Sequence, residues 1–118
     1  MITLISCGLS YQNSPEAIDV RKILDPEARP ELKPLNGTHK AVQDYVKGNP
    51  KFDECIQSIL DKVDGTLENQ TIIVGCLAGK HRSVAFVEIT ARILIGAGFK
   101  VRVFHGDLWR YGMDMRNV

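Results

Sequence analysis

The pattern of hydrophobic residues alternates along the chain between short runs typical of strands and longer stretches with helical spacing. The pattern predicts strands at residues 2–7, 17–20, 71–74 and 100–104. It predicts helices at residues 38–46, from after Pro50 to about Val63, and at residues 83–95. Residues 25–37 contain three prolines and an Asn-Gly turn signal, so we expect an extended loop there.

Two of these elements bear on how the layers are arranged. Residues 71–74 are a continuous apolar and β-branched run, which is typical of a central parallel strand covered on both faces. The helix at residues 83–95 is apolar nearly all round, which indicates burial against the sheet and against a second partner. The element order therefore predicts an α/β fold: one small three-layer domain spanning residues 1–118, with a mostly parallel sheet of about four strands.

Composition narrows the class of protein. The 118 residues suit one domain. The chain has 15 basic and 14 acidic side chains, so its net charge gives no argument for nucleic-acid binding. The charges are uneven, however: residues 1–78 hold 8 basic and 11 acidic side chains, and residues 79–118 hold 7 basic and 3 acidic ones. Positive potential therefore gathers in the C-terminal part.

Cysteine use and hydropathy indicate the compartment. The three cysteines lack the paired spacing of a disulfide framework or a zinc site, which favours a reducing environment and predicts no metal. Residues 1–6 do not resemble a signal peptide, and no apolar run is long enough to span a membrane. We therefore expect a cytoplasmic protein without a membrane partner.

Polar or Gly-containing sequence follows each predicted strand. Tyr11 follows the first, Asp19 and Arg21 lie at the second, and His105 and Asp107 follow the fourth. If the strands are parallel, these side chains meet at the carboxyl edge of the sheet, where open α/β folds bind ligands.

The segment after the third strand, Gly75–Ser83, has the parts of an anion-binding loop. Gly79 permits a left-handed turn that points backbone N–H groups inward, and the following helix adds its positive end. Arg82 can fork onto two phosphate oxygens, Lys80 adds charge, and His81 can bind as a cation or transfer a proton. The loop lacks the Walker A spacing, so we expect no Mg-ATP hydrolysis.

Two family resemblances include this loop. Cys76-Leu-Ala-Gly79-Lys-His-Arg82-Ser83 resembles the C-x-x-G-x-x-R-S loop of cysteine-dependent protein tyrosine phosphatases. That resemblance implies Cys76 as nucleophile, Arg82 as phosphate clamp, and Asp107 or Asp19 as general acid. It covers one loop only, and Gly75 stands where that family usually has His.

The second resemblance covers nearly the whole chain. Four segments occur in the order in which they are found in one family: Asp19-Val20-Arg21, the Pro-rich stretch ending in Gly37, the string Gly75-Cys76-x-x-Gly79-Lys80-His81-Arg82-Ser83-Val84, and His105-x-Asp107-Leu108. Together they resemble the C-terminal domain of the RNase adapter protein RapZ. In that family this domain binds small regulatory RNA and senses an amino-sugar phosphate. The family's N-terminal P-loop half has no counterpart here, so its nucleotide chemistry is not carried over.

Some positions depart from the family pattern. Leu77 and Ala78 replace Thr and Gly of the common C-T-G-G-K-H-R-S loop, and Gly106 replaces Arg in the family's H-R-D-L. A basic or aromatic position of the family's first loop corresponds to Tyr11.

We therefore expect a regulatory domain that binds a phosphorylated small molecule, either a sugar phosphate or a nucleotide-like one, without a cofactor. The predicted ligand-binding residues are Cys76, Leu77, Ala78, Gly79, Lys80, His81, Arg82, Ser83, Tyr11, Arg21 and His105. Two alternatives stay open: a cysteine-dependent phosphatase, and an RNA-binding adaptor whose loop is structural. RNA as a second partner and a homo-oligomer, through the 83–95 helix or the 109–115 segment, are also predicted.

Overall fold

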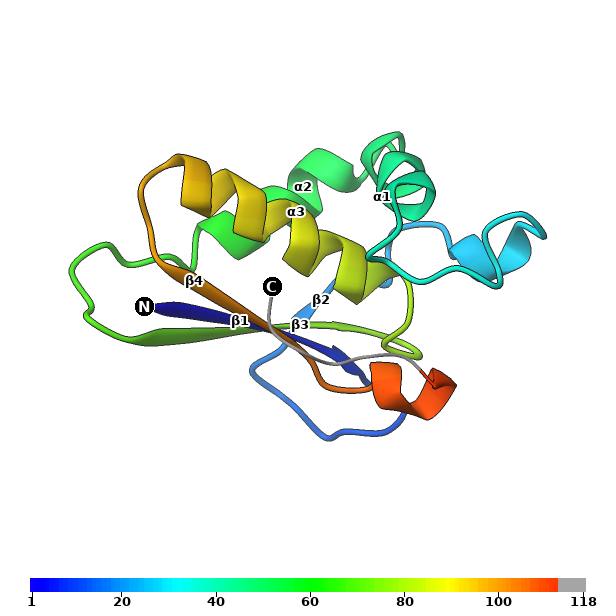
Figure 1. Cartoon of the computed structure of the whole chain (residues 1–118), viewed down its shortest axis with the longest axis horizontal. Coiled ribbons are helices and arrows are strands. Elements are labelled where there is room, and N and C mark those ends of the chain that lie inside the picture. The colour runs from blue at the N-terminus through cyan, green and yellow to red at the C-terminus, as the bar shows by residue number, and fades with distance from the viewer. Residues whose placement is uncertain (113–118) are drawn as a thin grey trace.

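Four parallel strands form one sheet in the order β2-β3-β1-β4 in the computed structural model, which describes residues 1–112 (Figure 1). The strands are β1 (Ile2–Gly8), β2 (Ile18–Asp19), β3 (Gln70–Cys76) and β4 (Val101–His105). β1 lies in the centre, with Ser6 opposite Val74 of β3 and opposite His105 of β4. The predicted four-stranded parallel α/β sheet is confirmed.

The helices confirm the predicted number and order, with small shifts at their ends. They are α1 (Lys40–Lys47), α2 (Phe52–Leu60) and α3 (Arg82–Gly96), together with the 3-10 helices η1 (Pro26–Ala28) and η2 (Leu108–Tyr111). The first helix was expected from Thr38, but α1 begins at Lys40 with His39 as its N-cap residue, and Thr38 N–H donates to the Asn36 side chain. Asn36 therefore forms a local turn before the helix instead.

All three α-helices lie on one face of the sheet, whereas helices on both faces were expected (Figure 1). The strand order explains this difference. The connections from β2 to β3 and from β3 to β4 run in the same direction across the sheet, so two right-handed crossovers place their helices on the same side. The return from β1 to β2 runs along the opposite face as the irregular segment 9–17 (Figure 1).

The face opposite the helices is only partly covered. Ile5 lies between Ile73 and Phe104 across three strands, and Phe104 is 39% exposed. The helix α3, by contrast, packs on β1, β3 and β4 and is covered by α1 and α2. Its apolar surface is therefore taken up largely by its own chain, and the surplus apolar surface lies on the sheet instead.

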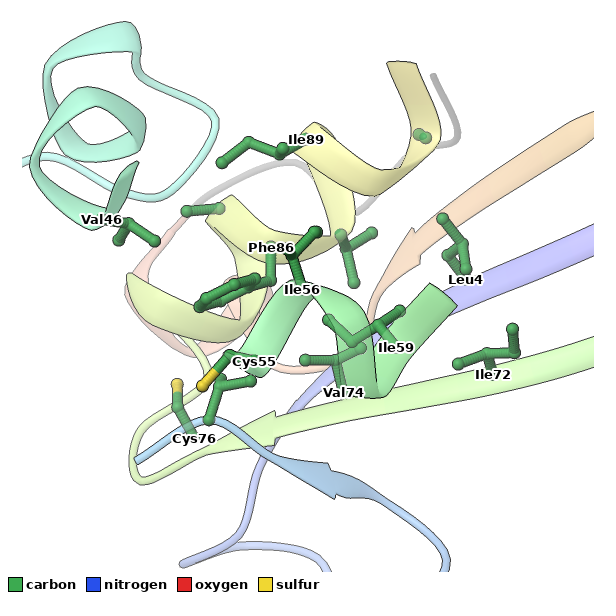
Figure 2. Close-up of a cluster of buried hydrophobic side chains, with 14 of the residues drawn as sticks. Leu4, Val46, Cys55, Ile56, Ile59, Ile72, Val74, Cys76, Phe86 and Ile89 are labelled. Carbon is green, nitrogen blue, oxygen red and sulfur yellow. The ribbon is translucent and has the colours of Figure 1, made fainter. Parts of the chain in front are cut away.

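Phe86 lies at the centre of the core between α3 and the other helices (Figure 2). Its side chain is fully buried, and its ring stacks on Phe52 of α2 with centroids 5.4 Å apart. Ile56 and Ile59 of α2 and Val74 of β3 belong to the same cluster. This contact fixes α2 against the N-terminal half of α3, next to the loop that leaves β3.

We expect Phe86→Ala to lower the free energy of unfolding by about 3–5 kcal/mol, because it empties a large buried volume that the neighbours fill only in part. Ile95→Ala is the control, since Ile95 is 55% exposed at the far end of α3. Urea denaturation of both variants measures the difference. Equal losses in the two variants would contradict the assigned core.

Candidate functional site

The loop from β3 into α3 packs closely against the end of β1. Gly79 has a φ of +70°, and a Cβ at this position would lie 2.7 Å from the backbone nitrogen of Gly8. Gly37 approaches the start of α3 in the same way, because a Cβ there would collide with Ala85 N and His81 O. Both positions therefore require glycine for the close approach. Gly79 is also required for its left-handed backbone conformation.

The carbonyl groups of the loop are held by donors outside it. Leu9 N–H donates to Cys76 O at 2.7 Å, and both the N–H and the hydroxyl of Ser10 donate to Leu77 O. The hydroxyl of Tyr111 donates to Ala78 O at 2.7 Å. Gly37 N–H donates to Lys80 O at 2.9 Å.

Holding the carbonyls in this way orients the amides. In a trans peptide the N–H points opposite to the C=O of the same plane, so each held carbonyl turns the next N–H away from its donor. Among residues 1–112, no acceptor is present for the backbone N–H groups of residues 77–84. We name these N–H groups the amide cradle. It includes the first N–H groups of α3, where the helix dipole is positive.

A cavity of about 230 Å³ lies against this loop. It is lined by Asp25, Glu27, Cys76, Leu77, Ala78, His81 and Arg82. Five of these residues come from the predicted anion-binding loop, and the two carboxylates come from the segment around η1. The two acidic side chains are about half exposed.

Arg82 is buried, and most of its guanidinium is already engaged. One terminal nitrogen donates to the backbone oxygens of Arg21 and Ile23 at 3.1 Å each, and the other lies 3.4 Å from the Asp25 carboxylate. Its Nε has no partner among the described residues. Arg82 therefore fastens the 21–25 segment to α3, and its Nε is a buried donor left without a partner among the described residues.

His81 is also buried at the loop, with 4% of its surface exposed. Its Nε2 has no hydrogen-bond partner within the described chain, and its Nδ1 lies 3.9 Å from Glu27. Burial, followed by the charge of Lys80, lowers the pKa of the imidazole below its ordinary value. His81 is therefore neutral at pH 7 and able to donate or accept a hydrogen bond.

The remaining loop residues have structural partners. Cys76 is buried, and its thiol donates to the Ser83 hydroxyl at 3.2 Å; that hydroxyl donates in turn to Cys7 O at 3.3 Å. Lys80 reaches the Pro-rich segment, where its Nζ donates to Lys33 O at 2.9 Å.

Two side chains predicted at the site from the end of the fourth strand are buried in the sheet edge, with Asp107 against Gly79 of the loop. His105 is 1% exposed; its Nε2–H donates to Glu88 at 3.1 Å, and its Nδ1 lies 2.8 Å from the Ser6 hydroxyl. Asp107 is fully buried and accepts three hydrogen bonds. The donors to Asp107 are Gly8 N, Gln12 Nε2 and Arg110 Nε. Both side chains hold the sheet edge together.

Three other predicted residues gather at a second, larger cavity. Tyr11, Asp19 and Arg21 line an open groove of about 640 Å³ along residues 9–15. Arg21 and Asp19 form an exposed ion pair at 2.7 Å, which lowers the pKa of the Asp19 carboxyl. The sequence did not single out Tyr111 or Asp25, because neither lies in a motif; they reach the loop only through the fold.

We expect the free energy of unfolding to fall as the pH drops from 7 to 5, and His81→Asn to reduce this dependence. The folded pKa of His81 is lowered, so below about pH 6.5 the unfolded chain takes up a proton that the folded chain refuses. Urea titrations at both pH values measure the effect. Parallel pH dependence in the two proteins would contradict the burial of a neutral His81.

Three curated relatives are similar to this chain in sequence. Each is named a nucleotide-binding protein: one from Mycolicibacterium smegmatis at 39% identity, one from Mycobacterium ulcerans at 36% and one from Anaeromyxobacter dehalogenans at 34%. The matches cover 91–92% of this chain and 40–42% of the relatives. The chain thus spans about two fifths of the length of the relatives it matches.

No helix among residues 1–112 has the length and apolar character needed to cross a membrane. A family model for the RapZ C-terminal domain matches residues 1–109, which include every strand, the loop and the first half of η2. The chain therefore belongs to the RapZ C-terminal domain family.

Proposed function

We propose that this domain is a regulatory module that binds a phosphorylated small molecule, with the phosphate on the amide cradle of residues 77–84. One observation carries the proposal: consecutive N–H groups without an acceptor in the described chain lie beside the carbonyls of Cys76, Leu77, Ala78 and Lys80, which are held by donors outside the loop. Backbone N–H groups need partners, and an anion at the start of a helix supplies several at once.

Two side-chain atoms add to the cradle. The Nε of Arg82 and the Nε2 of His81 belong to buried residues that line the adjoining cavity, and both lack a partner within residues 1–112. A phosphate bound there gains a charge-assisted hydrogen bond from the guanidinium. It also raises the pKa of His81 toward its ordinary value, because an anion favours the protonated imidazole.

The acidic side chains at the cavity favour one class of ligand. Asp25 and Glu27 repel a second phosphate but accept hydrogen bonds from an ammonium or hydroxyl group. We therefore favour a monophosphorylated sugar with polar donors over a nucleoside triphosphate. The family resemblance, which implies an amino-sugar phosphate, supports this choice, whereas the names of the relatives point to nucleotides.

The phosphatase alternative keeps one supporting feature, because Cys76 lies at the loop with its thiol on Ser83. Its proposed general acids are engaged elsewhere: Asp107 is buried under three donors and Asp19 is paired with Arg21. Binding without phosphate transfer is therefore the function that the arrangement favours.

Calorimetry tests the proposal with an amino-sugar phosphate, the same sugar without its phosphate, inorganic phosphate and a nucleoside monophosphate. We expect binding to require the phosphate group and Arg82→Ala to weaken it at least tenfold, as for loss of a charged donor. The variant also unfolds more easily, because Arg21 O, Ile23 O and Asp25 lose their donor.

Arg102→Ala is the control, since Arg102 is an exposed cation on β4 far from the loop in sequence. Equal affinity for the phosphorylated and unphosphorylated sugar would refute the site. Aryl phosphate turnover that disappears in Cys76→Ser would replace the proposal with the phosphatase.

RNA binding is a second candidate that one cluster of side chains favours. The guanidinium of Arg110 lies 4.0 Å from the ring of Tyr11 and 4.5 Å from that of Trp109, and both rings are about half exposed. Aromatic faces with cations beside them stack bases and contact phosphates.

We expect any RNA affinity to be modest and to fall steeply between 50 and 200 mM salt, because it depends on a few phosphate contacts. Fluorescence anisotropy with a structured RNA measures this, and Trp109→Ala weakens binding. Tight binding that ignores both salt and Trp109 would rule out this surface.

Homo-oligomerisation stays a prediction, with a different physical basis. Most of α3 is covered within its own chain, and Met113 and Met115 lie outside the described residues. The apolar surface that a second subunit would cover is the open sheet face at Ile5, Ile73 and Phe104.

A further inference from the structure

The peptide group between Ala78 and Gly79 is the plane of the amide cradle that backbone torsions restrain least, although its carbonyl lies against Gly8. Rotating this plane by half a turn mainly changes ψ of Ala78 and φ of Gly79, and glycine accepts φ values of either sign. Gly79 now has a φ of +70°. A turned plane would direct the Ala78 carbonyl, instead of the Gly79 N–H, toward a bound anion.

Neighbouring peptide groups are better restrained. The Leu77 carbonyl accepts from both the N–H and the hydroxyl of Ser10, and turning that plane would change φ of Ala78, which unlike glycine strongly disfavours positive values. The Cys76 carbonyl accepts from Leu9 N–H, which continues the pairing of β1 with β3.

The Ala78 carbonyl has a single donor within residues 1–112, and that donor is a side chain. Tyr111 Oη donates to it at 2.7 Å, from the last residue of η2. The neighbouring hydroxyl of Tyr11 lies 3.4 Å from the same oxygen atom of Tyr111. Burial, followed by the hydrogen bond with Tyr11, raises the pKa of Tyr111, so its hydroxyl stays a donor throughout the neutral range.

We infer that Tyr111 is a positioning residue for the anion site: its hydroxyl holds the Ala78–Gly79 peptide with the Gly79 N–H turned into the amide cradle. The inference rests on the proposed phosphate binding. Tyr111 itself does not contact the anion in this arrangement; it acts through the orientation of one backbone donor. Removing the hydroxyl frees the plane to turn and leaves the other amides of the cradle in place.

The test follows backbone amide resonances of the ¹⁵N-labelled full chain during titration with inorganic phosphate, against chloride at equal ionic strength. In the wild type we expect the N–H groups of residues 77–84 to respond, Gly79 among them. In Tyr111→Phe we expect the Kd for phosphate to rise about tenfold, as for one lost donor to an anion, and the Gly79 response to disappear. The responses of residues 82–84 persist.

Tyr45→Phe is the matched control, because it removes a tyrosine hydroxyl on α1 and keeps the bond from Tyr111 to Ala78. We expect this variant to bind phosphate as the wild type does. The ring of Tyr111 lies 5.4 Å from Lys80 Nζ, and Tyr111→Phe keeps that contact, so a change in affinity reports on the hydroxyl.

The outcomes separate the two hypotheses. A wild type with no phosphate response at residues 77–84 would refute the proposed function itself. A responding wild type with a Tyr111→Phe variant of equal affinity and unchanged Gly79 response would overturn the role of Tyr111 alone. Loss of the responses of residues 82–84 together with that of Gly79 would show that Tyr111 merely supports the fold, and would also overturn the inference.

Discussion

The close packing of the β3–α3 loop against the end of β1 is the constraint on which the site depends. Gly8 and Gly79 meet with no room for a Cβ on either, which brings Leu9 and Ser10 within hydrogen-bond distance of the loop carbonyls. Once these carbonyls are held, the trans geometry of the peptide groups directs the following N–H groups to the other side. The proposed anion site is thus prepared by hydrogen bonds that do not involve the anion.

A second set of contacts, made of buried hydrogen bonds, stabilises this edge of the sheet. His105 connects β1 to α3 through Ser6 and Glu88, and Asp107 ties Gly8 N–H to Gln12 and Arg110. Buried polar groups are costly unless they are satisfied, so such a network fixes one arrangement of strand ends. Residues that resemble ligand contacts in the sequence therefore stabilise the frame that carries the loop.

Arg82 likewise combines a structural role with a donor left free among the described residues. Its terminal nitrogens hold the 21–25 segment, which carries Asp25 to the rim of the cavity, and its Nε remains available. A guanidinium can serve both purposes because its five N–H donors lie in a fixed planar fork. The proposed anion site and the acidic side chains beside it therefore share Arg82, and a change at this residue affects both.

Local sequence determined the elements and the loop of this protein. The apolar run at 71–74, the helical spacing of 83–95 and the string from Gly75 to Ser83 depend on neighbours in the chain, so their pattern predicted the parallel strand, the helix and a glycine turn between them. The order of elements also predicted the parallel sheet, because a helix between two strands is the usual connection of parallel neighbours. Tertiary structure alone decided the placement of the helices on one face, since strand order is a long-range choice that hydrophobic periodicity does not encode. It also decided which polar side chains reach the loop. His105 and Asp107 turn inward because they form hydrogen bonds with buried donors and acceptors. Tyr111 is 33 residues from Ala78 in the chain, and it contacts the loop only because β4 and η2 fold against β1.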